Sequence, residues 1–203
     1  MKNTLLDKSF IEADGHVLIK DADSGEVLLD KHNAINFENI SEAMAGALAN
    51  KTEPVSGQLY HIDKLAYGDA GTETSATGAI TYKAPNVNDT DDQLHNQTYE
   101  KSVNASLETG DPAFDPDNKV VQSHPAGEHY TDLVITSTLD YSEPGDQRET
   151  DGDNGVTPVY VFDELGIKLK TGKLISHIIF HPIEKSANRR IQIVYTLRIR
   201  AGK

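Results

Sequence analysis

The sequence predicts a mainly β protein with antiparallel sheets in a β-sandwich-like arrangement, one short helix and long polar loops. Three observations lead to this fold class. Residues 191–200 alternate apolar and polar side chains, as in a strand with one face in a core. Two apolar segments near the N-terminus flank a turn-forming run. Only residues 39–50 carry apolar side chains at helical spacing. We therefore treat residues 1–203 as a single β-rich domain.

The first predicted element is a hairpin formed by residues 16–20 and 26–30. Its connection, residues 21–25, reads Asp-Ala-Asp-Ser-Gly. The Asp and Ser side chains can bond to the backbone of a turn, and the glycine accepts a positive φ angle. Two strands joined by a tight turn follow from this pattern.

The single predicted helix runs from Ile40 to Ala49. One face carries Ile40, Met44, Ala47 and Leu48, the spacing of one buried stripe. Asn39 is the predicted N-cap, with Glu42 three residues later in the manner of a capping box, and Asn50 is the predicted stop. A helix of about three turns cannot form a core alone, so we expect it to pack against sheet.

The middle of the chain is poor in regular patterns. Residues 58–67 and 79–83 are predicted strands. From residue 84 to 128 the chain is polar and contains Asp-Pro and His-Pro pairs that disfavour regular structure, and we expect only one strand there, at residues 97–107. The rest of 84–128 is a predicted excursion, and excursions of this length are typically binding loops or segments that gain order on assembly.

The C-terminal third contains the clearest strands. Residues 131–139 are rich in β-branched side chains, and residues 159–170, 174–181 and 191–200 are further predicted strands. In the last of these one face should be core, and it consists of Ile191, Ile193, Tyr195, Leu197 and Ile199.

The charge is unevenly distributed along the chain. The net charge is −13; residues 1–165 hold 10 basic and 31 acidic side chains, whereas residues 166–203 hold 9 basic and 1 acidic. The negative body argues against nucleic acid and anionic membranes as main partners. The chain has no cysteine, which excludes disulfides, thiolate zinc sites and a cysteine nucleophile. It also lacks a secretory signal or a bilayer-spanning apolar segment, so we expect the chain to be made and used without passing through a translocon.

The sequence yields no catalytic, cofactor or metal residues. Residues 21–26 resemble the start of a calcium loop, but Glu26 stands where glycine is needed and His32 where a bidentate glutamate is needed, so we interpret them as a turn. Residues 115–118 and 151–155 are likewise interpreted as solvated loops. His177 and His181 should lie on one face of a strand, roughly 13 Å apart, too far to share one zinc. We predict that the chain is not an enzyme.

Two parts of the chain resemble tailed-bacteriophage virion proteins. The hairpin turn 21–28, the following Asn33-Ala34-Ile35 and the glycine-containing turn at 67–72 are similar to the opening of many such proteins. The order of residues 162–167, 172–180 and the strand 191–199, with Lys185 between, is similar to attachment domains of tail-fibre and collar proteins. The resemblance covers about the first 70 and the last 45 residues.

The resemblance implies a virion structural protein that is made in the host cytoplasm and assembles with itself and other particle proteins. A fibre would continue into a repetitive shaft, whereas this chain ends at Lys203. We therefore expect an adaptor, collar, baseplate or neck subunit in a symmetric homo-oligomer, or alternatively a capsid decoration protein. A calcium-ordered β-sandwich binding module of the lectin or adhesin type is the alternative from another class.

The charge asymmetry suggests how such an oligomer would be held together. Acidic loops around residues 84–128 and 140–155 of one copy would lie against basic strand faces of another, and the assembly should weaken as salt rises. The predicted interface residues are Lys168, Lys170, Arg189, Arg190, Arg198 and Arg200.

Overall fold

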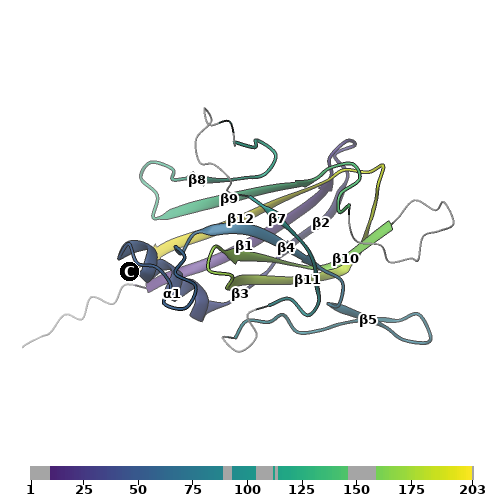
Figure 1. The fold of residues 1–203 in the computed structure, drawn as a ribbon, viewed down its shortest axis with the longest axis horizontal. Helices are drawn as coiled ribbons and strands as arrows, with labels where there is room; N and C mark the ends of the chain where they lie inside the picture. The colour runs from purple at the N-terminus through teal and green to yellow at the C-terminus, as the bar shows by residue number, and fades with distance from the viewer. Residues whose placement is uncertain (1–9, 89–92, 104–111, 113, 146–158, 203) are drawn as a thin grey trace, which may run out of the picture.

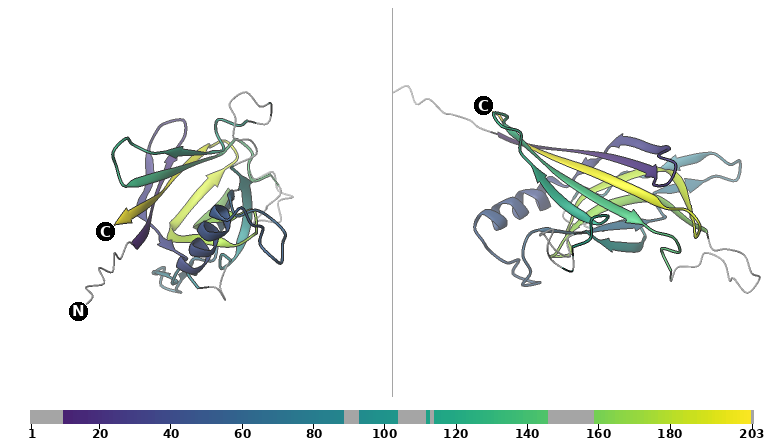
Figure 2. Two further views of the ribbon diagram at one scale, coloured as in Figure 1. Left: turned by 90° about the vertical axis from the view of Figure 1, so that its left-hand side faces the viewer. Right: turned by 90° about the horizontal axis from the view of Figure 1, so that it is seen from above.

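The computed structural model describes residues 10–88, 93–103, 112, 114–145 and 159–202. Two five-stranded antiparallel sheets lie face to face, and the single helix of the described residues, α1, lies at one end of the sandwich (Figures 1 and 2). The predicted fold class, mainly β and sandwich-like with antiparallel sheets and one helix, is confirmed.

One sheet, which we call sheet A, joins strands from three distant parts of the chain. Its order is β2-β1-β12-β9-β8. The bounds are β1 Phe10–Asp21, β2 Val27–His32, β8 Lys119–Ser123, β9 Tyr130–Leu139 and β12 Ile191–Gly202.

The facing sheet, sheet B, has the order β3-β11-β10-β4-β7. A separate two-stranded hairpin, β5 with β6, lies beside it (Figure 1). The bounds are β3 Ala34–Ile35, β4 Ile62–Gly68, β5 Thr72–Thr74, β6 Ile80–Tyr82, β7 Gln97–Ser102, β10 Val159–Leu169 and β11 Leu174–Ser186.

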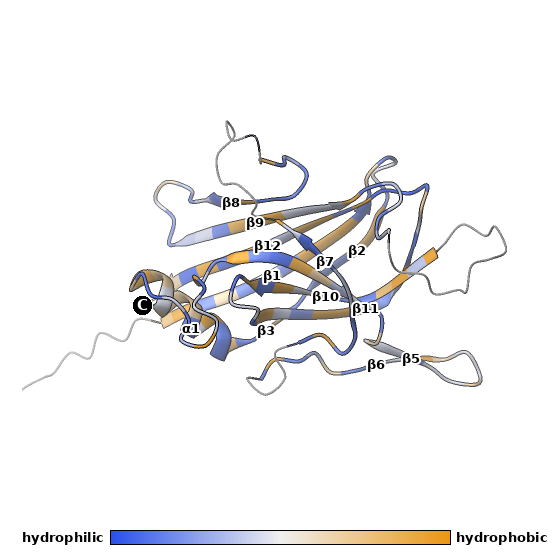
Figure 3. Cartoon of the chain, in the orientation of Figure 1, coloured by the Kyte–Doolittle hydropathy of each residue, from blue (hydrophilic) through white to orange (hydrophobic). Residues whose placement is uncertain are grey.

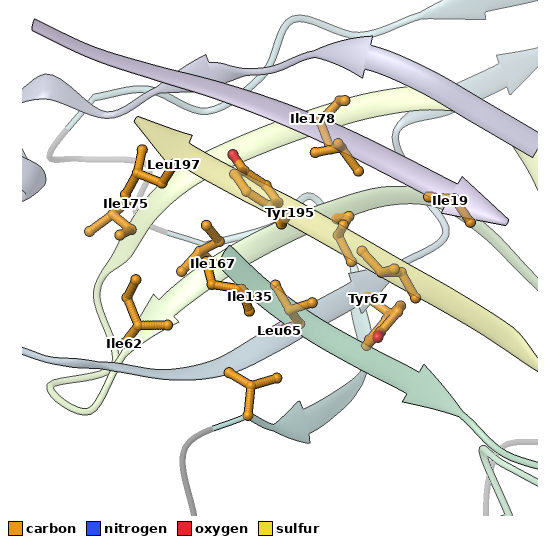
Figure 4. Packing of buried hydrophobic residues seen from close by; sticks show 14 of the residues in the cluster. Ile19, Ile62, Leu65, Tyr67, Ile135, Ile167, Ile175, Ile178, Tyr195 and Leu197 are labelled. Carbon is orange, nitrogen blue, oxygen red and sulfur yellow. The ribbon is translucent and has the colours of Figure 1, made fainter. Parts of the chain in front are cut away.

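The core lies between the two sheets and follows the alternation of their strands. Figure 4 shows Ile19 and Tyr195 from sheet A with Leu65, Ile167 and Ile178 from sheet B, all of them at most 3% exposed. The predicted core face of the last strand is confirmed in large part, because the four residues Ile191, Ile193, Tyr195 and Leu197 are buried.

Two tyrosine hydroxyls carry hydrogen bonds through this apolar core. Tyr67 on β4 bonds to Ser137 on β9 at 2.9 Å, and the Ser137 hydroxyl donates to Asn118 at 3.3 Å. The side-chain amide of Asn33 donates to the Tyr195 hydroxyl. Burial raises the pKa of both tyrosines far above its usual value, so both hydroxyls stay neutral, and the bond between Tyr67 and Ser137 links sheet B to sheet A.

Helix α1 runs from Phe37 to Leu48, so it begins three residues and ends one residue earlier than predicted. The predicted N-cap was wrong: Asn36 caps the helix by accepting the Asn39 N–H at 3.0 Å. Asn39 is instead buried, and its amide donates to the Leu174 carbonyl at 2.8 Å. Asn50 has a φ of 50° directly after the C-cap residue, in agreement with its predicted role as the stop.

The middle of the chain is more regular than predicted. The excursion at 84–128 contains β8, which pairs with β9 at the edge of sheet A. Strand β7 occupies the first part of the strand predicted at 97–107, and residues 104–107 lie outside the described residues. The short strands β3 and β5 were also missed, because two or three residues are too few for a sequence period.

Polar residues dominate the loops, and apolar residues alternate with polar ones along the strands (Figure 3). Within the described residues, no helix has both the length and the apolar character that crossing a membrane requires.

Truncation of Leu165 tests the core. Leu165 is fully buried on β10, so Leu165→Ala removes apolar contacts and leaves a cavity. We expect the free energy of unfolding to fall by about 2–5 kcal/mol in urea titrations with an unchanged m-value. Val27→Ala is the matched control, because Val27 is 56% exposed, and it should change stability by less than about 0.5 kcal/mol. Equal losses in both variants would contradict this core.

Candidate functional site

The most concentrated polar chemistry of the described residues lies on the outer face of sheet B. Strand β10 carries two adjacent buried carboxylates, Asp163 and Glu164, at 3% and 0% exposure. The register of β10 against β11 shifts between Phe162 and Glu164. Because of this irregularity the two acids contact two different chain segments, and we call Asp163, Glu164, His95 and His177 the carboxylate clamp.

Glu164 holds the segment that begins at residue 93 against the sheet. Its carboxylate accepts the backbone N–H of His95 at 2.9 Å and that of Asn96 at 2.8 Å, and it bonds to His177 Nε2 at 3.0 Å. Burial raises the pKa of Glu164, but the hydrogen bonds from His177 and the two backbone groups outweigh this effect and leave the pKa below its usual 4.5. The group is therefore a carboxylate at neutral pH.

Asp163 holds the turn between β4 and β5. One carboxylate oxygen accepts the Gly71 N–H at 2.8 Å, and the other accepts the N–H and the hydroxyl of Thr72 at 2.7 and 2.5 Å. The clamp thus fixes two polar segments through backbone donors that would otherwise need water.

A small apolar cluster lies beside the clamp. It consists of Ala66, Leu94 and Leu174, all at most 5% exposed. Gly166 lies beneath it: a Cβ atom there would be 2.4 Å from the Leu174 side chain and 2.9 Å from the Ser176 carbonyl. Residue 166 must therefore be glycine for Leu94 to close over the sheet.

The clamp brings together three potential metal ligands. The ligand atoms of His95, Glu164 and His177 lie within 4.8 Å of one another. However, His177 Nδ1 accepts the Asn86 N–H at 2.8 Å, so the proton of the neutral ring resides on Nε2 and is donated to Glu164. A metal at Nε2 would displace that proton and leave an imidazolate. The hydrogen bonds therefore fit a structural latch and do not fit a metal centre.

The prediction for His177 and His181 assumed a regular strand and did not include the register shift between β10 and β11. His177 is fully buried, whereas His181 is exposed. The register shift opposite residues 179–183 separates the environments of the two rings. The sequence signal for the clamp was present in a different form, as two consecutive acids inside an otherwise apolar strand.

The predicted interface residues are distributed over both sheets. Lys168 on β10 donates to Gln93 and Gln97, and Lys170, just after the end of β10, is 3.3 Å from Asp63.

The four predicted arginines each have an acidic partner in the same chain. Arg189 Nε lies 2.8 Å from Asp21, Arg190 Nε 3.4 Å from Asp140, and Arg200 3.7 Å from Glu12. Arg198 makes two bonds to Asp132, at 2.7 and 2.9 Å, and its guanidinium lies 4.0 Å from the centre of the Tyr130 ring. Each of these arginines therefore has an ion-pair partner within one copy, and their role between copies stays a prediction.

The predicted turn chemistry of the first acidic loop is confirmed. Asp21 accepts the N–H groups of Asp23 and Ser24 and the Ser24 hydroxyl, and its other oxygen accepts from Arg189. The Ser24 backbone and Arg189 together hold the pKa of Asp21 well below its usual value.

The second acidic loop is also a turn. The Asp115 carboxylate accepts hydrogen bonds from the Asp117 N–H and the Asn118 side-chain amide. The third loop, residues 151–155, lies outside the described residues.

An apolar groove opens between α1 and the sheets. Its volume is about 620 Å³, within the range of sites that bind small molecules or partner side chains. The walls come from α1, from the segment that leads into β4, and from strands of both sheets: Ile40, Ala43, Met44, Ala47, Tyr60, His61, Ile62, Val120, Gln122, Leu133, Leu169, Ile175, Leu197 and Ile199. The sequence did not predict the groove, because it forms only when α1 stands away from β8 and β9.

Comparisons of the chain with protein-family models, with curated proteins and with solved structures find no match.

Removal of the clamp carboxylate tests its role. In Glu164→Gln, one oxygen is replaced by an NH₂ group that faces the donors of His95, Asn96 and His177. We expect a loss of about 1–3 kcal/mol in the free energy of unfolding and faster amide exchange at residues 95 and 96. Glu100→Gln is the matched control, since Glu100 forms a half-exposed pair with Lys64 and should cost less than about 1 kcal/mol. Unchanged amide exchange at residues 95 and 96 would contradict this role of the carboxylate clamp.

The depressed pKa of Glu164 also predicts a pH dependence. A group whose pKa is lower in the folded state contributes stability above its unfolded value, here 4.5, and loses that contribution as the pH falls through the folded pKa. The difference in unfolding free energy between the native chain and Glu164→Gln should therefore be constant from neutral pH down to about 4.5 and shrink below it. A difference that grows with acidification would refute the assignment.

Proposed function

We propose that this chain is a non-enzymatic structural subunit that assembles with other copies of itself and with other proteins of a particle. The resemblance to tailed-phage virion proteins gives the class of particle, with an adaptor, collar, baseplate or neck position, or alternatively capsid decoration. The observation that best supports an assembling subunit is the apolar groove at the α1 end.

The same end of the molecule exposes several large apolar side chains. Phe37 and Leu48 at the two ends of α1 are 66% and 87% exposed, and Val55 and Leu59 in the following loop are 94% and 48% exposed. Several large exposed apolar side chains at one end of a folded chain are typical of an interaction site. Apolar residues both line the groove and project beside it, so two copies related by a two-fold axis would each supply side chains to the other.

Apolar contacts and charge contacts predict opposite responses to salt. The arginines of the predicted interface already have acidic partners in their own chain, and exposed pairs of this type contribute little. Assembly through the groove would persist at high salt, whereas assembly through exchanged ion pairs would weaken.

A charge placed in the groove tests the proposal. Ala47 lines the groove and Leu48 is exposed beside it. In Ala47→Asp/Leu48→Asp we expect at least a tenfold weaker self-association, measured by light scattering after size-exclusion chromatography over a concentration series at 0.1 and 1 M NaCl. Val27→Asp is the control on the β1–β2 hairpin and should associate like the native chain.

Two results would contradict the proposal. One is a native chain that remains monomeric at every concentration and is also absent from purified particles. The other is self-association that the double variant leaves intact and that 1 M NaCl abolishes. That result would favour an interface formed by the predicted basic residues.

A further inference from the structure

The outer face of the β1–β2 hairpin gathers two histidines and two aspartates. His16 on β1 and His32 on β2 are direct cross-strand partners. Asp14 lies two positions before His16 and Asp30 two positions before His32, so all four side chains lie on the same face of sheet A. Their side chains are 38% to 71% exposed.

A β-bulge creates this arrangement. Ile19 pairs with Leu29, but Lys20 pairs with Val27, so Leu28 is an extra residue on β2. Without it, His16 would lie opposite Lys31, and His32 and Asp30 would turn to the inner face, because a shift of one residue reverses every side chain. The extra residue therefore places all four groups together.

Each imidazole has one nitrogen held by a carboxylate. His16 Nε2 lies 2.6 Å from Asp30, and His32 Nδ1 lies 3.3 Å from Asp14. When a carboxylate accepts the N–H of one ring nitrogen, the other nitrogen carries the lone pair that a metal needs. The lone pairs are then on His16 Nδ1 and His32 Nε2.

The spacing of the rings suits one shared ion. Their centroids are 5.3 Å apart and their planes are inclined by 66°. Two imidazoles bound to one tetrahedral zinc through bonds of about 2.0–2.1 Å have ring centres roughly 5 Å apart. We propose that His16 and His32 bind a divalent transition-metal ion of the zinc type, with Asp14 and Asp30 as the carboxylates that orient the two rings.

This site differs from the carboxylate clamp in whether each imidazole has a nitrogen available to bind a metal. In the clamp, both nitrogens of His177 are hydrogen-bonded within the chain. On the hairpin each ring keeps one nitrogen that has no hydrogen bond to the described residues, and the surface position leaves coordination sites for water or for a group from a neighbouring molecule.

Calorimetric titration with Zn²⁺ alone at pH 7.5 tests the site. We expect one ion per chain, with at least tenfold weaker binding in His16→Gln/His32→Gln. Asp30→Asn should weaken binding by about tenfold without removing a ring, because it removes only the orienting carboxylate. His124→Gln/His129→Gln is the matched control with two exposed histidines elsewhere, and it should bind like the native chain.

A second readout does not depend on variants. Zn²⁺ should shift the imidazole resonances of His16 and His32 and leave those of His95 and His177 in place. The proposal is overturned if the native chain binds no zinc, if the His16→Gln/His32→Gln variant binds as tightly as the native chain, or if His95→Gln alone abolishes binding. None of these outcomes bears on the groove, so this inference and the assembly proposal can fail separately.

Discussion

The pairing of β1 with β12 is the constraint on which the rest of the structure depends. The ladder runs without a register shift from Phe10 opposite Gly202 to Asp21 opposite Ile191, so it joins the two ends of the described chain. Strand β12 also pairs with β9, whose residues lie 52 to 70 positions earlier in the chain. The apolar faces of these three strands then form one wall of the core, and sheet B has a surface on which to pack.

The carboxylate clamp solves a different problem for sheet B. A sheet whose outer face is partly covered by polar loops must satisfy the backbone N–H groups that those loops bury. Two acids in consecutive positions, Asp163 and Glu164, accept from backbone groups of two separate segments. Buried charges are tolerated there because each oxygen has donors, and the resulting network fixes the loops more specifically than apolar contact would.

The sequence predicted what depends on local periodicity and missed what depends on a partner strand. The alternation of residues 191–200, the hairpin turn at 21–25 and the helical spacing of residues 40–49 are local, and the elements they predicted are present. The bulges at Leu28 and opposite residues 179–183 arise from pairing, and no local pattern marks them. For this reason neither the opposition of His16 and His32 nor the difference in burial between His177 and His181 was predictable.

The strand order of sheet A brings the basic end of the sequence next to acidic parts of the chain. Strand β12 carries Arg198 and Arg200, and it lies between two strands that carry acids on the same outer face, with Asp14 and Asp132 directly opposite Arg198. The four arginines near the end of the chain thus pair with acids of the acidic body within a single copy. The two proposed binding sites lie outside these ion pairs. One consists of the apolar side chains at the α1 end, and the other of the imidazoles of His16 and His32 on the β1–β2 hairpin.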